Sequence, residues 1–226
     1  MNASSVSPAA VLARTGLYRK LADAEFTGCG ESALASTFSA DDSGQATRCG
    51  LMDLTPLART GFRGNNAAAH LQAAGYPVPE KANMAAVAAQ GETVLRLSQR
   101  EFWVLGSLAD DGASLTVLNA AARPDSGCYP LFCMDSHGWL LLSGELRAAV
   151  MAKLCGVDMR ESAFPAGSIA QTSVARINAI IASHEVNGVP VFSILCDSGY
   201  VAYLWDVLLD AMQEFGGTPV GSSALK

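Results

Sequence analysis

Cysteine and histidine are the residue types in this chain best suited to metal binding or nucleophilic chemistry. The sequence contains six cysteines and three histidines. The two closest thiols, Cys128 and Cys133, would need two further ligands to hold zinc, no Cys-x-x-Cys pair is present, and the histidines are far apart in sequence. We therefore expect no metal site, and we interpret the cysteines as reduced thiols, buried or in loops, of a cytoplasmic protein.

Sequence motifs for nucleotide binding and hydrolysis are absent. The chain has no P-loop, no dinucleotide-binding glycine motif, no His-Glu-x-x-His and no Gly-x-Ser-x-Gly. The segment Gly28-Cys29-Gly30 is not preceded by the strand that a phosphate-binding loop requires, and nothing in the pattern places a histidine beside Cys29. We therefore expect no catalytic residue in this chain.

Arg176 is the charged residue of most interest for binding, because it comes directly before an apolar stretch that is expected to be a strand. An arginine at the end of a strand either extends its stem along the apolar surface toward solvent or binds a carboxylate. The carboxylate would belong to a ligand or to a partner protein. The residue types leave both interpretations open.

Two sets of strands and helices must position these side chains. In the first set we expect a strand over residues 57–63, a turn at Gly64-Asn65-Asn66, a short helix over 67–74, and a hairpin of 93–97 with 101–105. Residues 113–122 fit a helix or a strand equally well. Composition also separates residues 1–50, which are polar and weakly periodic, so we expect an extended N-terminal arm that packs on a partner, followed by one domain over 51–226.

The second set repeats the order of the first. We expect a strand over 139–142, a helix from Ser143 to Leu154, and a hairpin of 177–182 with 191–196 that includes Asn187-Gly188. A final helix over 200–215 carries apolar residues at helical spacing. Strand, helix and hairpin in both halves predict an α+β fold of two similar halves.

Composition excludes several classes of function. Half of the 226 residues are hydrophobic and 16% are charged, which excludes a disordered chain. No apolar run approaches the roughly 20 residues that span a bilayer. The net charge is −6 without a basic stripe, so we expect no nucleic-acid partner. The N-terminus lacks the features of a signal peptide, and we expect a cytoplasmic protein without membrane contact.

Several segments resemble known families. Residues 49–71, which begin Cys-Gly-Leu-Met-Asp-Leu-Thr-Pro-Leu, resemble the start of the folate-binding fold of the glycine-cleavage T-protein, an aminomethyltransferase. Residues 204–221 resemble the last helix of that fold and the Pro-x-Gly after it. Residues 152–158 and 164–176 resemble the gamma subunit of heterotetrameric sarcosine oxidase, and Ala-Gln-Thr-Ser-Val-Ala-Arg at 170–176 is the most specific part.

The resemblance implies a folate-binding, aminomethyltransferase-like fold with ferredoxin-like elements. It also implies a non-catalytic gamma-type subunit of a sarcosine-oxidase-like complex, which oxidatively demethylates an N-methyl amine and passes the one-carbon unit to tetrahydrofolate. Tetrahydrofolate, FAD, FMN and NAD are then expected in the partner subunits, and no cofactor is expected in this chain. The alternative with the same fold is a stand-alone tetrahydrofolate-binding module that resembles a one-carbon transferase.

The site residues also follow from the resemblance. T-proteins carry a Gly-Gly-x-x-Asp-Asp run with a catalytic, folate-contacting Asp, whereas residues 88–93 here contain none. T-proteins also carry a Tyr-Thr-Gly-Glu segment after the Arg that Arg176 resembles, and Glu185 lies in the corresponding region of this chain. The resemblance therefore marks Arg176 and Glu185 as the folate-binding candidates. Because a general base must be present to act, the missing Asp argues against folate catalysis by this chain alone.

Overall fold

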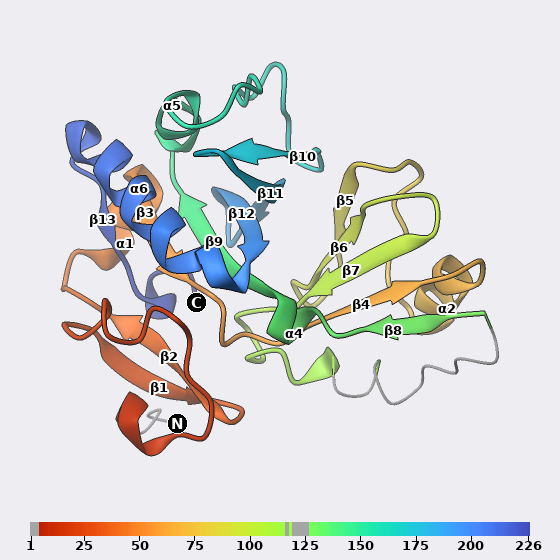
Figure 1. Ribbon diagram of the computed structural model, residues 1–226, viewed down its shortest axis with the longest axis horizontal. Coiled ribbons are helices and arrows are strands. Elements are labelled where there is room, and N and C mark those ends of the chain that lie inside the picture. The colour runs from red at the N-terminus through yellow and green to blue at the C-terminus, as the bar shows by residue number, and fades with distance from the viewer. Residues whose placement is uncertain (1–4, 116–117, 119–126) are drawn as a thin grey trace.

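Two β-sheets packed against each other form the centre of the molecule, and helices cover their outer faces (Figure 1). The computed structural model describes residues 5–115, 118 and 127–226. Three hydrophobic clusters correspond to this layering: one between the sheets and one under the helices on each outer side. The expected α+β architecture is confirmed.

The first sheet has the strand order β5-β6-β7-β4-β8, with every neighbouring pair antiparallel. Its strands are β4 (Arg59–Arg63), β5 (Met84–Val87), β6 (Thr93–Arg96), β7 (Glu101–Leu105) and β8 (Tyr129–Leu131). Helix α2 (Ala67–Ala73) covers its outer face through Ala67 and Leu71. The predicted strand, short helix and hairpin are confirmed. Residues 113–122 lie partly outside the described residues, and Ser114, Leu115 and Leu118 are helical.

The second sheet has the order β10-β11-β12-β9-β3-β13. Its strands are β3 (Gly50–Asp53), β9 (His137–Ser143), β10 (Ile169–Val174), β11 (Ile177–Val186), β12 (Val189–Asp197) and β13 (Thr218–Pro219). Only the pairing of β13 with β3 is parallel among these described strands. Asn187 and Gly188 join β11 to β12 with φ of 49° and 79°, the left-handed pair that a two-residue hairpin turn requires.

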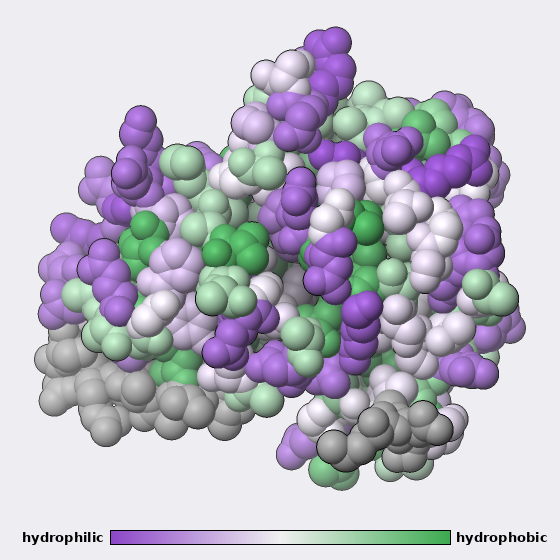
Figure 2. All heavy atoms as spheres, turned by 180° about the vertical axis from the view of Figure 1, so that it is seen from behind, coloured by the Kyte–Doolittle hydropathy of each residue, from purple (hydrophilic) through white to green (hydrophobic). Residues whose placement is uncertain are grey.

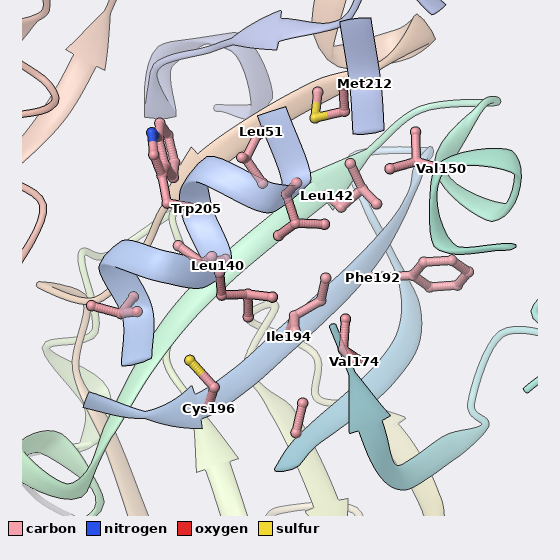
Figure 3. Packing of buried hydrophobic residues seen from close by; sticks show 14 of the residues in the cluster. Leu51, Leu140, Leu142, Val150, Val174, Phe192, Ile194, Cys196, Trp205 and Met212 are labelled. Atoms are coloured by element: carbon pink, nitrogen blue, oxygen red, sulfur yellow. The ribbon is translucent and has the colours of Figure 1, made fainter. Parts of the chain in front are cut away.

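Helices α5 (Arg147–Ala152) and α6 (Val201–Met212) cover the outer face of the second sheet. Alternate residues of β9 and β12 point toward them, among them Leu140, Leu142 and Ile194 (Figure 3). The apolar stripe of the last helix is confirmed, because Leu204 and Leu208 are fully buried. Buried apolar surface of this kind contributes about 25 cal/mol per Å².

The helix expected from Ser143 is shorter than predicted. Ser143 is the last residue of β9, where its hydroxyl donates to the carbonyl of Gly50 at 3.3 Å. Gly144 follows with a φ of 94°, and its backbone lies against Arg48 so closely that a side chain would collide. The chain therefore turns here before α5 begins at Arg147.

The expectation of an extended arm over residues 1–50 is wrong for the described part of that segment. It contains strands β1 (Glu25–Cys29) and β2 (Ser32–Thr37), which form an antiparallel hairpin, and helix α1 (Asp42–Arg48). Leu17 and Phe26 join the core on the helix-covered face of the second sheet. The segment is short of apolar residues, but the core supplied by residues 51–226 buries several of those it has. The described elements are completed by α4 (Cys133–Ser136) and four 3₁₀ turns: Pro8–Ala10, Ser198–Tyr200, Gln213–Phe215 and Ser222–Leu225.

Asp42 joins the N-terminal segment to the far end of the chain. One carboxylate oxygen accepts the backbone N–H groups of Phe38 at 2.8 Å and Gly221 at 2.9 Å. The other accepts the N–H and the hydroxyl of Ser39 at 2.8 and 2.9 Å. Burial by itself would raise the pKa of Asp42, but these donors, led by the N–H of Phe38, hold the pKa below its usual value.

Candidate functional site

A pocket of about 610 Å³ lies where the two sheets meet. Its walls come from the β5–β6 connection, the loop after β7, the inner face of β9, the end of β11 and Leu225. Apolar side chains such as Leu54, Trp139 and Leu141 form much of the lining. A cavity of this size between packed elements is where small-molecule sites are commonly found.

Among the described residues, the carboxylates that line this pocket are Asp110 and Glu185, and no described lysine or arginine lines it. Both oxygens of Asp110 are engaged, because they accept the N–H groups of Gly112 and Ser114 at 2.9 Å each. Glu185 is exposed, and in the part of the chain that the structure describes it makes no side-chain hydrogen bond or ion pair. Glu185 is therefore the carboxylate of this lining that is available to a ligand.

Residues 88–93, which lack the catalytic Asp of T-proteins, form one side of the pocket. Ala88, Ala89, Gln90 and Gly91 line the cavity, whereas the acid of this stretch, Glu92, does not. Glu92 is buried, and its influence is on Tyr76: burial raises the pKa of Tyr76, and the negative charge of Glu92 raises it further. The position thus supplies no carboxylate to the pocket.

Three buried side chains at the pocket wall are linked by hydrogen bonds, and they were not identified from the sequence. The indole N–H of Trp139 donates to the hydroxyl of Ser193 at 3.0 Å, and that hydroxyl lies 2.8 Å from Nε2 of His184. Nδ1 of His184 has no hydrogen-bond partner among the described residues. Burial lowers the pKa of His184 to about 4, so the ring is neutral at neutral pH. The two-residue period of strand β11 could have located His184, because its neighbours in that period, Ala182 and Val186, also face the space between the sheets.

Arg176 lies far from the pocket. It is exposed in the two-residue turn between β10 and β11, whereas Glu185 is at the opposite end of β11. Nine residue steps along an extended strand separate the two by about 30 Å. The structure therefore does not bring Arg176 and Glu185 together, and of these two candidates only Glu185 lines the pocket.

The remaining reactive side chains are structural. All six cysteines are free, and burial raises the pKa of Cys29 to about 11 and that of Cys133 to about 12. Within the described residues no group of three or more His, Cys, Asp or Glu side chains is arranged to hold a metal ion. Arg59 is almost fully buried and donates to the backbone carbonyls of residues 55, 57, 133, 134 and 137, so it joins the β3–β4 connection to α4.

On the face opposite Figure 1, the described hydrophobic residues are scattered among hydrophilic ones (Figure 2). Among the described residues, no helix has the length and apolar character needed to cross a membrane.

Two antiparallel-rich sheets that meet at a pocket, with helices on both outer faces, agree with the folate-binding-fold class that the sequence resemblance implies. The chain belongs to the family described as GCVT N-terminal domain, whose sequence profile matches residues 81–226. The similarity extends to one particular group within that class. Sarcosine oxidase subunit gamma of Corynebacterium sp. (strain P-1) is 29% identical over 153 residues, which cover 68% of this chain and 72% of that protein. The resemblance stated from the sequence is confirmed.

Solved structures support the same fold. A chain of the heterotetrameric sarcosine oxidase from Corynebacterium sp. U-96, in complex with pyrrole 2-carboxylate, matches with a TM-score of 0.60 and 22% identity, over 79% of this chain and 92% of that chain. The glycine cleavage system aminomethyltransferase T from Bartonella henselae matches with a TM-score of 0.70 and 17% identity, over 94% of this chain and 61% of that chain. The aminomethyltransferase-like fold is thereby confirmed.

Proposed function

We propose that this chain is a non-catalytic, gamma-type subunit of a sarcosine-oxidase-like complex. The observation that carries the proposal is its similarity to a sarcosine oxidase gamma subunit over 72% of that protein. A fold match that covers 92% of a chain in a heterotetrameric sarcosine oxidase agrees with it. The complex would oxidatively demethylate an N-methyl amine and pass the one-carbon unit to tetrahydrofolate, and this chain would brace the folate-handling subunit.

The geometry of the pocket supports a role without catalysis. A general base needs a free lone pair within reach of the proton that it removes. The stretch that corresponds to the acidic run of T-proteins brings no carboxylate to the pocket, because Glu92 does not line it. The free carboxylate of the lining, Glu185, belongs instead to the end of β11. From the similarity to a gamma subunit we propose that tetrahydrofolate, FAD, FMN and NAD lie in the partner subunits of a cytoplasmic complex.

Co-expression with the products of the neighbouring genes tests the proposal. The chain is expected to purify together with a flavoprotein subunit, with flavin absorbance in the same size-exclusion peak as this chain. A chain that purifies alone while the flavoprotein subunits assemble without it would contradict the proposal.

Calorimetry distinguishes the stand-alone folate module. Folinic acid titrated into the isolated chain is expected to give no heat of binding up to millimolar concentration. Low-micromolar binding by the isolated chain would instead assign it a folate site of its own. An Arg176→Ala chain is the matched comparison: its position about 30 Å from Glu185 predicts that the substitution leaves any such binding unchanged.

A further inference from the structure

The turn between β10 and β11 has an unfavourable backbone conformation. Ala175 and Arg176 adopt φ of 48° and 69°, in the left-handed region where a side chain is sterically penalised. The other two-residue turn of this sheet, Asn187-Gly188, uses the residue types that tolerate the same region. Arg176 therefore occupies a position that glycine would fill at lower free-energy cost. Such strain in a well-packed turn is a mark of a functional side chain.

The turn is held from two sides. The backbone N–H of Ala175 donates to the carbonyl of Leu154, just beyond α5, at 2.9 Å. The hydroxyl of Tyr203, on α6, donates to the carbonyl of Ala175 at 3.1 Å. These two bonds hold the backbone of the turn that carries Arg176. A preorganised backbone loses less conformational entropy when the turn binds a partner.

The surroundings of Arg176 are suited to a protein partner. Arg176 is exposed, and no described acidic side chain pairs with it. Tyr203, on α6, is 47% exposed, and the bond from its hydroxyl to the carbonyl of Ala175 places it beside the turn. The nearby acid of α6, Asp206, is already paired with Lys20 at 2.7 Å. Arginine and tyrosine are the residues that most often dominate the binding energy of protein interfaces.

Charge decides between a small ligand and a polypeptide. The chain has a net charge of −6, and Arg176 is an exposed cation without an ion pair among the described residues, so it can bind an anionic group. An arginine fork binds a carboxylate through two parallel hydrogen bonds. A molecule in the pocket is about 30 Å away along β11 and cannot supply that carboxylate. A segment of a second polypeptide that crosses the turn can supply it.

We propose that Arg176, with Tyr203 beside the turn, is a docking point for a carboxylate on a polypeptide segment of a partner subunit. The ring of Tyr203 packs against that segment, and the guanidinium binds its Asp or Glu side chain. The inference rests on the proposed function, because the partner is another subunit of the same complex.

Three full-length variants test the docking point in the co-expressed complex. Ala175→Asn with Arg176→Gly copies the turn of residues 187–188, and it removes both the strain and the charge. Arg176→Glu reverses the charge. Arg100→Glu is the control, since Arg100 is equally exposed in the β6–β7 turn. The measurements are the affinity for the partner subunits, from titration of labelled chain, and the melting temperature of the isolated chain.

The Asn-Gly variant is expected to melt higher than the natural chain and yet to assemble about tenfold more weakly. Arg176→Glu is expected to weaken assembly by about a hundredfold, and Arg100→Glu by less than about twofold. A natural chain that assembles, together with turn variants of unchanged affinity, would overturn the docking point and leave the proposed function standing. A natural chain that never assembles would overturn both.

Discussion

Asp42→Asn tests whether the N-terminal segment is coupled in stability to the rest of the chain. The carboxylate of Asp42 accepts four hydrogen bonds, from Phe38, Gly221 and twice from Ser39. Asparagine has almost the same shape, but one of its two positions carries an NH₂ group. Whichever way the amide is oriented, two of the four donors then face another donor instead of an oxygen.

The magnitude follows from these bonds. A hydrogen bond to a charged acceptor contributes roughly 1.5–3 kcal/mol, and a buried donor left without an acceptor costs roughly 1–3 kcal/mol. We therefore expect Asp42→Asn to lower the free energy of unfolding by about 3 kcal/mol. For a chain of this length that corresponds to a decrease in Tm of about 6–12 °C.

The pH dependence gives a second signature. Because the donors hold the folded pKa of Asp42 below its unfolded value near about 4, the stabilisation is complete above that pH. It is lost as the pH falls through the lower, folded pKa. The natural chain is expected to lose this contribution in acid, whereas the Asn chain has none to lose.

Urea unfolding, followed by the fluorescence of the buried Trp139 and Trp205, measures the effect. Asp41→Asn is the matched control, because Asp41 is the exposed neighbour and its carboxylate receives only a long bond from Gln45, at 3.4 Å. We expect the control to change stability by less than about 0.5 kcal/mol. If the two variants unfold at the same urea concentration, residues 38–42 are not coupled to Gly221 and the reasoning fails.

Three further substitutions test other parts of the structure. Burial lowers the folded pKa of His184 to about 4, so the natural chain is expected to lose about 3 kcal/mol of stability as the pH falls from about 6.5 to about 4. His184→Gln should flatten that part of a curve of stability against pH. An unchanged slope would contradict the assignment. Arg59→Lys is expected to cost about 2–4 kcal/mol in urea unfolding, since one ammonium cannot replace a guanidinium that reaches five carbonyls; a cost below about 1 kcal/mol would show that those bonds contribute little. Gly144→Ala is expected to lower the free energy of unfolding by about 2–4 kcal/mol, because the φ of Gly144 is 94° and the new Cβ would lie 2.5 Å from the backbone of Arg48. Gly156 has open space around it, so Gly156→Ala is expected to change the free energy of unfolding by less than about 0.5 kcal/mol.

Local patterns were sufficient to predict much of the fold. The β6–β7 and β11–β12 hairpins have apolar alternation and turn residues within a few positions of one another, and α6 has an unbroken apolar stripe. The N-terminal hairpin was missed because its stability depends on contacts that are remote in sequence. Phe26, for example, is buried against a core built by residues of β9, β12 and α6.

The candidate site was predicted only in part, for a similar reason. Glu185 and the stretch 88–93 were located through the resemblance, and Glu185 and residues 88–91 line the pocket. The chain from Trp139 through Ser193 to His184 joins residues 54 positions apart, which no local pattern reveals. The position of Arg176 was also hidden, since Ala-Arg is not a sequence that signals a left-handed turn.

The bond between Asp42 and Gly221 has a consequence for the order of folding during synthesis. The two residues are 179 positions apart, and β13 beside β3 closes the second sheet in the same region. The β1–β2 hairpin and α1 leave the ribosome well before the residues that complete their packing. Contacts of such long range form slowly and leave apolar surface exposed in the meantime. A nascent chain stopped before residue 218 is therefore expected to need chaperone protection.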